Sequence, residues 1–134
     1  MHLINIIHQY ANIEFNFEKV RRLVNPELPS RFLSLFLAEN NIDGKVMLKN
    51  MFPHKKDHII APMKIKFLIN FHKADSQWFD EYFKTRDEKA IYNYWQGNDY
   101  NKIPLYEYLI DGQIELKDKE DHIKIISENK LRHD

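Results

Sequence analysis

The chain has 134 residues, of which 43% are hydrophobic and 13% aromatic, so it can build a packed core of the size found in a single domain. Its 20 lysines and arginines balance its 20 aspartates and glutamates, which argues against bulk electrostatic capture of nucleic acid or of an anionic membrane. There is no cysteine, which excludes disulfides and thiolate chemistry and fits a cytoplasmic protein. No apolar run reaches the roughly 20 residues that span a bilayer, and we expect residues 1–134 to form one domain outside the membrane.

Hydrophobic spacing predicts the elements of the first half of the chain. Residues 3–8 form a short apolar run that is typical of a strand. Residues 14–24 follow helical spacing, and two prolines end that helix. Residues 31–38 are apolar on both faces except for Arg31 and Ser34, which predicts a central strand covered on both sides. Residues 43–51 are expected to form a short helix, and a loop follows.

The second half continues the mixture of strands and helices. Residues 63–71 alternate as a strand with one face deep and the other partly exposed. Asp75 or Ser76 is expected to cap a helix, and a second helix is predicted from Asp87 to Trp95 with its end at Gly97. The tail, residues 122–127, fits either a strand or a helix. The order predicts an α+β fold with a split or mixed, mostly antiparallel sheet flanked by helices.

Residues 104–116 are the most informative segment for function. They are predicted to form a strand, a glycine turn at Gly112 and a second strand. Side chains alternate along a strand, so Glu107 shares a face with Leu105 and Leu109. A carboxylate inside an apolar stripe costs free energy unless it is paired or used, which makes Glu107 the leading candidate for chemistry.

Three segments together carry a resemblance to known proteins. They are Pro29-Ser30-Arg31-Phe32-Leu33-Ser34-Leu35-Phe36, His72-Lys73-Ala74-Asp75 with Trp78, and Tyr94-Trp95-Gln96-Gly97 leading into Glu107-Tyr108-Leu109-Ile110-Asp111-Gly112. This combination resembles a family of small uncharacterised bacterial and phage proteins related to ADP-ribosyltransferases of the DarT-like and PARP-like type. The likeness covers most of residues 14–116, and it implies an ADP-ribosyltransferase-like fold.

The resemblance implies an NAD-dependent mono-ADP-ribosyltransferase that modifies a protein or a nucleic acid. NAD would be the substrate, no metal would be needed, and Glu107 would be the catalytic residue that binds the nicotinamide ribose. A fixed carboxylate suits this chemistry, because cleavage of the nicotinamide–ribose bond develops an oxocarbenium-like cation. The implied cofactor-binding residues are Arg31 for the pyrophosphate, Ser34 for the ribose or the nicotinamide amide, Tyr94 or Trp95 for ring stacking, and His8 on the first strand.

The same residues also have purely structural explanations. Glu107 can pair with Arg31, Lys64 or Lys66 across a sheet, and Arg31 can be a polar strand start. Ser34 can be a satisfied core hydroxyl, while Tyr94 and Trp95 can be packing residues. An enzyme requires an open cleft beside Glu107, whereas a closed salt bridge in the core argues against one.

The second functional class is therefore a non-enzymatic interaction protein, such as a phage inhibitor, an immunity factor or an antitoxin-type factor. Trp78, Tyr82 and Tyr100 would then be exposed anchors for a partner.

A metal site is a weaker alternative. His54, His58, His72 and Asp75 can be drawn as a cluster, but the chain has no His-Glu frame and no cysteine around them, so no metal is predicted. Lys55 and Lys56 lie with His54 and His58 in the loop predicted at residues 53–62, and two lysines are too few for a nucleic-acid stripe.

Overall fold

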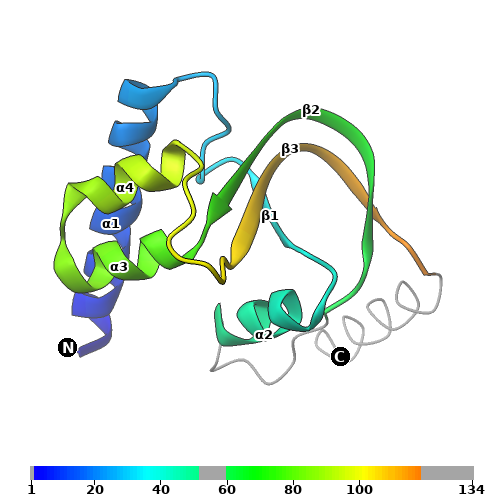
Figure 1. The fold of residues 1–134 in the computed structure, drawn as a ribbon, viewed down its shortest axis with the longest axis horizontal. Coiled ribbons are helices and arrows are strands. Elements are labelled where there is room, and N and C mark those ends of the chain that lie inside the picture. The colour runs from blue at the N-terminus through cyan, green and yellow to red at the C-terminus, as the bar shows by residue number, and fades with distance from the viewer. Residues whose placement is uncertain (1, 52–59, 119–134) are drawn as a thin grey trace.

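The computed structural model describes residues 2–51 and 60–118, and Figure 1 shows their arrangement. The fold is α+β, as the sequence predicts, with four helices and a three-stranded antiparallel sheet among these residues. The helices are α1 (His2–Val24), α2 (Ile42–Met51), α3 (Gln77–Thr85) and α4 (Glu88–Trp95). The strands are β1 (Leu35–Ala38), β2 (Met63–Asp75) and β3 (Tyr106–Leu116). The loop predicted at residues 53–62 falls largely outside the described residues, and the element predicted at residues 122–127 falls wholly outside them.

Helix α1 begins at His2, so the strand expected at residues 3–8 is wrong. A short apolar run fits either a strand or one turn of a buried helix, and periodicity alone does not separate them. No glycine or proline interrupts residues 2–24, so the helix, once nucleated around its buried stripe, extends through the run. Ile13, Phe17 and Val20 form that stripe, at helical spacing, and are buried.

The sheet has the order β1-β3-β2, which places β3 at the centre and β1 at an edge. The expectation of a central strand at residues 31–38 is therefore wrong. Residues 31–33 form a turn instead, and the strand starts only at Leu35. Pro29 and Ser30 precede this turn, and the Ser30 hydroxyl accepts a hydrogen bond from the Phe32 amide.

Strand β3 runs without a break through Asp111 and Gly112, so the predicted glycine turn is also wrong. Gly112 lies opposite Leu68, next to two register shifts in β2. A Cβ at position 112 would lie 2.2 Å from the carbonyl oxygen of Phe67. The glycine therefore permits close approach of the irregular partner strand rather than a change of direction.

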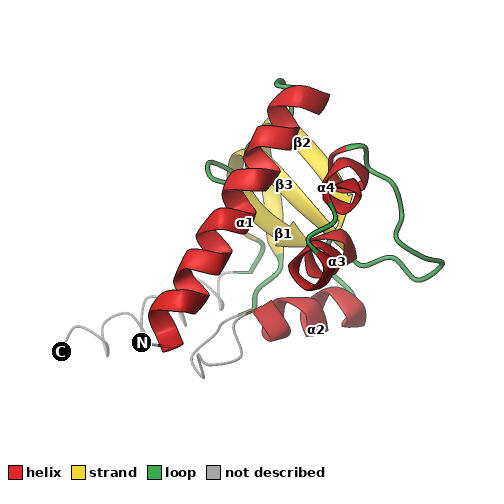
Figure 2. Ribbon diagram, turned by 90° about the vertical axis from the view of Figure 1, so that its left-hand side faces the viewer, coloured by secondary structure: helices red, strands yellow, loops and turns green. Residues whose placement is uncertain are grey.

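The core lies between α1, α3, α4 and one end of the sheet. Figure 2 shows the arrangement of the backbone, with α1 crossing in front of the strands. Its largest fully buried side chains include Trp95, Tyr94, Phe17 and Leu109. The indole nitrogen of Trp95 donates to the carbonyl oxygen of Phe17 at 2.7 Å, which joins α4 to α1.

Helices α3 and α4, which follow β2, begin and end close to their predicted positions. Helix α4 has Asp87 as its N-cap, whose carboxylate accepts from the amide of Lys89 at 3.0 Å. Ser76 occupies the N-cap position of α3 without a side-chain capping bond, and its hydroxyl donates to the carbonyl oxygen of Leu105 instead. Gly97, past the end of α4, has a φ of 73°, which suits glycine.

Strands β2 and β3 extend well beyond β1 as a two-stranded ribbon, which arches away from α1, α3 and α4 in Figure 1. We call residues 63–70 and 111–116 the exposed ribbon. Every residue from 64 to 69 is exposed, so the expectation that one face of β2 is deep is wrong for this part of the strand. Only the last part of β2, which includes His72 and Ala74, reaches the core.

Candidate functional site

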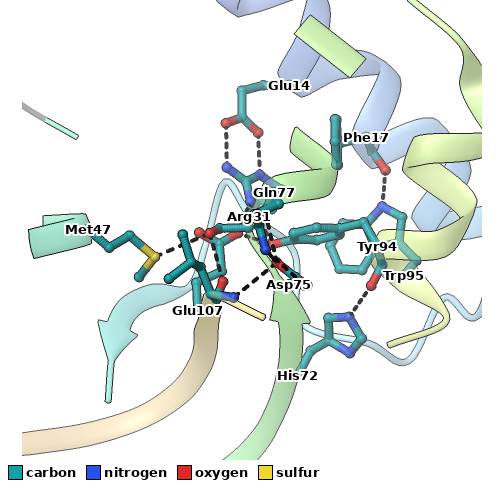
Figure 3. Close-up of polar contacts among 12 residues, drawn as sticks. Glu14, Phe17, Arg31, Met47, His72, Asp75, Gln77, Tyr94, Trp95 and Glu107 are labelled. Carbon is teal, nitrogen blue, oxygen red and sulfur yellow. Dashed lines mark hydrogen bonds and ion pairs between the residues drawn. The ribbon is translucent and has the colours of Figure 1, made fainter. Parts of the chain in front are cut away.

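Four side chains from four parts of the chain meet in one buried polar cluster, which we call the Arg31 cluster (Figure 3). Glu14 comes from α1, Arg31 from the turn before β1, Tyr94 from α4 and Glu107 from β3. The fold thus brings together Arg31, Tyr94 and Glu107, three of the residues that the sequence singles out.

Arg31 is the centre of the Arg31 cluster and has a partner on every side. Its Nε and Nη2 donate to the two carboxylate oxygens of Glu14 at 2.8 and 2.9 Å, in a bidentate pair. Its Nη1 donates to Glu107 Oε1 and to the Tyr94 hydroxyl, each at 2.6 Å. Such a fork of planar donors is specific to arginine, and lysine could not reproduce it.

Aromatic rings enclose the Arg31 guanidinium. Its Cζ lies 4.6 Å from the ring centroid of Phe79 and 4.9 Å from that of Phe36, with Phe17 and Tyr94 slightly further away. Cation–π attraction is stronger at such a desolvated site than at the surface. Burial by itself opposes the charge, but the neighbouring Tyr94, Glu107 and Glu14 outweigh it and raise the pKa of Arg31 well above its ordinary value.

Tyr94 is fully buried and completes the cluster. Its hydroxyl donates to Glu107 and accepts from Arg31. Burial raises the pKa of Tyr94 well above its ordinary value, so the phenol stays protonated and serves as a hydrogen-bond donor. Edge-on packing against Phe17 and Trp95 fixes the ring in place.

A second ion pair positions the turn that carries Arg31. Arg21 donates to both carboxylate oxygens of Glu18, and its Nη1 also donates to the carbonyl oxygens of Pro26 and Leu28, each at 2.7 Å. Glu18 in turn accepts from the Ser30 hydroxyl at 2.9 Å. Hydrogen bonding to Arg21 lowers the pKa of Glu18, which keeps the carboxylate charged. The chain that precedes Arg31 is thus held against α1 by side-chain bonds.

His72 and Asp75, the other polar side chains buried near the Arg31 cluster, have structural partners. His72 Nε2 lies 2.9 Å from the Tyr94 carbonyl oxygen, and burial lowers the pKa of His72. The Asp75 carboxylate accepts from the amides of Gln77, Tyr100 and Leu105, which ties the segment after α4 to the start of α3. Within residues 2–51 and 60–118, no group of three or more histidine, cysteine, aspartate or glutamate side chains is arranged so that it could hold a metal ion.

The remaining predicted site residues do not join the Arg31 cluster. Ser34 lies immediately before β1, is half-buried, and makes no side-chain hydrogen bond to any residue that the structure describes. His8 lies on α1 rather than on a first strand, so its expected position is wrong, and the structure does not describe its side chain. Trp95 packs in the core and donates to Phe17, so it does not offer a free face for stacking.

Sequence reasoning missed Glu14, although the sequence contains a signal for it. Glu14 precedes Phe17 by three residues and so lies next to it on the surface of α1. A carboxylate beside the buried stripe of a helix needs a charged or hydrogen-bonding partner, as Glu107 does in its strand. Both acids form salt bridges with the guanidinium of Arg31.

Chemically, the Arg31 cluster is closed. The side chains of Arg31 and Glu107 are only 7% and 6% exposed, and Glu14, at 26%, is the outermost member. Among the described residues, no buried side-chain nitrogen or oxygen lacks a hydrogen-bond partner. Glu107 therefore has the salt bridge with Arg31 that the structural explanation expects, and its side chain is not exposed to an open cleft.

A surface pocket of about 200 Å³ lies elsewhere, between α2 and the segment before β3. Glu39, Asp43, Met47 and Tyr106 are among the side chains that line it. None of the four members of the Arg31 cluster contributes to this pocket.

The fold and the Arg31 cluster define a small α+β protein in which Arg31, through Glu14, Tyr94 and Glu107, joins α1 and α4 to β3. The chain belongs to the family described as "Protein of unknown function (DUF2441)", which it matches over residues 1–128. Comparisons with curated proteins and with solved structures found no match. Along the described residues, no helix combines the length and the apolar character needed to cross a membrane.

Proposed function

We propose that this protein is a non-enzymatic interaction protein that binds a partner protein through the exposed ribbon. The observation that carries the proposal is the run of large apolar side chains there: Ile65, Phe67, Leu68 and Ile69 are 41–66% exposed. Phe71, just beyond the ribbon on β2, is 52% exposed. Single exposed apolar residues are ordinary, but adjacent ones on a protruding element are typical of interaction sites.

The anchors expected from the sequence contribute less to such a surface. Tyr82 is 4% exposed and belongs to the core, so its expected role as an exposed anchor is wrong. Trp78 is half-buried, and its indole nitrogen donates to the Asn98 carbonyl oxygen. Tyr100 is 39% exposed, but its hydroxyl is bonded to Glu81. The candidate surface is therefore on β2 rather than on α3 and the segment after α4.

The test compares capture of partners by three forms of the full chain, each immobilised and exposed to an extract of its source cells. The double variant Phe67→Thr, Ile69→Thr removes apolar area while threonine keeps the preference for strand. Leu23→Gln on α1 is the control, since it removes a side chain that is 73% exposed but lies far along the chain from the ribbon. We expect one protein to be retained by the wild type and by Leu23→Gln, and lost from the double variant. Equal capture by all three forms would contradict the proposal.

A second candidate is the ADP-ribosyltransferase-like activity with NAD as substrate. One observation favours it: the fold brings Arg31, Tyr94 and Glu107 together, and these are the residues that the resemblance assigns to NAD binding and catalysis. NAD does not fit the Arg31 cluster as it stands, because each of these side chains is nearly buried and already bonded to the others. The candidate therefore requires an open state in which Arg31 separates from Glu107.

Nicotinamide release from labelled NAD, measured in the presence of cell extract, tests this candidate. Glu107→Gln is compared with Glu18→Gln, which changes a buried carboxylate that also pairs with an arginine. A transferase predicts release by the wild type and by folded Glu18→Gln, with loss in folded Glu107→Gln. No release by the wild type, or equal release by the two variants, would contradict it.

A further inference from the structure

The outer edge of β2 has no strand beside it in the described part of the chain. β2 pairs with β3 along one side, and the sheet order β1-β3-β2 leaves its other side at the rim. From residue 64 to residue 69 the strand is exposed on both faces as well. An edge of this length with apolar side chains can accept an extended segment from another chain, through backbone hydrogen bonds.

The charges on this edge are of one sign. Lys64 and Lys66 are exposed, and neither takes part in an ion pair with a described residue. Glu115 of β3 lies opposite Lys64 in the ladder, whereas Lys66 falls at a register shift and has no residue opposite it. Lys66, which has no acidic residue opposite it, therefore carries its positive charge where the ladder is irregular, near the middle of the exposed segment.

This pattern distinguishes between two possible occupants. A second copy that pairs antiparallel with the same edge would bring its lysines close to these lysines, and like charges across a ladder are unfavourable. Lysines and bulges on an edge are devices that prevent such self-pairing. A strand that carries acidic side chains between apolar ones would instead complement both the lysines and the neighbouring Ile65, Phe67 and Ile69.

We propose that residues 63–69 form a docking edge for an extended segment of a partner protein in which acidic and apolar residues alternate. This inference rests on the proposed interaction function and names the recognition that would serve it. The partner strand extends the sheet next to β2, with its acidic side chains at Lys64 and Lys66.

The experiment uses the full chain, labelled for NMR, and three synthetic peptides. The first peptide is a blocked nine-residue chain of alternating valine and glutamate. The second has lysine in place of each glutamate, and the third has proline at the central position, which removes a backbone donor and breaks strand pairing. We expect the glutamate peptide to shift the amide resonances of residues 63–69 saturably, and the other two to bind at least roughly tenfold more weakly.

The variant Lys64→Glu, Lys66→Glu is the matched test on the protein side. Both side chains are exposed, so the variant is expected to fold, and its affinity for the glutamate peptide should fall by roughly tenfold. Equal binding of the glutamate and lysine peptides, shifts confined to other residues, or no saturable shift would overturn the inference. Concentration-dependent dimerisation that broadens the same resonances without peptide would also overturn it, in favour of a second copy.

The two proposals fail separately. Capture of a partner can depend on Phe67 and Ile69 and yet be unaffected by Lys64→Glu, Lys66→Glu. That result would support the interaction function and contradict recognition of an acidic strand. If every ribbon variant still captured the partner and still bound the peptide, both proposals would be contradicted.

Discussion

Replacing Arg31 with methionine tests whether the Arg31 cluster holds the fold together. The change keeps most of the aliphatic stem but removes both bonds to Glu14 and the bonds to Tyr94 and Glu107. It also removes the cation from among four aromatic rings. Glu107 then remains buried without its charged partner.

The magnitude follows from this loss. Breaking a buried ion pair by removing one partner costs about 3–5 kcal/mol of unfolding free energy, because the remaining charge stays desolvated. A domain of this size has about 5–15 kcal/mol in all, so the variant is expected to be marginal but measurable. Arg22→Met is the matched control: the Arg22 side chain is 70% exposed and lies 3.3 Å from Glu18, so its loss should cost less than about 1 kcal/mol.

The assay is urea unfolding at neutral pH, followed by tryptophan fluorescence from the half-buried Trp78 and the buried Trp95, with wild type and both variants compared at equal concentration. We expect the unfolding midpoint of Arg31→Met to fall far below that of Arg22→Met. Equal midpoints for the two variants, with unchanged urea dependence, would refute the reasoning and indicate that the Arg31 cluster is not a structural centre.

Three further predictions concern the same unfolding measurement. Burial lowers the pKa of His72 in the folded protein, so the unfolded chain binds a proton first as the pH falls. The contribution of neutral His72 to the free energy of unfolding is therefore present above about pH 6.5 and is lost below it. His72→Gln should flatten the dependence of the unfolding midpoint on pH, whereas parallel curves for wild type and variant would argue against this role. Asp87→Ala should cost about 1 kcal/mol through loss of the cap of α4, and no change in midpoint would show that the cap contributes nothing. Gly112→Ala should lower the free energy of unfolding more than Gly97→Ala does, because a Cβ at position 112 would lie 2.2 Å from the Phe67 carbonyl oxygen. Gly97→Ala is expected to cost about 1 kcal/mol, since Gly97 has a positive φ. The reverse order would contradict the close approach of the strands at Gly112.

Local sequence patterns predicted which face of its strand Glu107 occupies. Alternation placed Glu107 and Leu109 on one face of β3, and both are buried. Pairing of Glu107 with Arg31 was one of three possibilities, and the structure selects it over Lys64 and Lys66. The helix at Asp87 followed from its cap, since a cap is a contact between near neighbours in the chain.

Long-range contacts decided what those patterns did not. Gly112 reads as a turn residue in isolation, and only the irregular partner strand shows that close approach is its role. The alternation of residues 63–71 predicts a buried face, but burial depends on what packs against a strand, and the helices cover only its last part. Glu14 joins the Arg31 cluster across 17 positions of sequence, through a turn whose path depends on the Glu18–Arg21 pair.

The central claim is that the exposed ribbon is the binding surface and that Glu107 is a structural residue. The most direct measurement is the affinity of the captured partner, purified, for two variants under conditions where both are folded: Glu107→Gln, and Phe67→Thr with Ile69→Thr. We predict that Glu107→Gln binds within about twofold of the wild type, while the ribbon variant loses roughly tenfold or more. Loss of binding in folded Glu107→Gln together with wild-type affinity in the ribbon variant would contradict the claim.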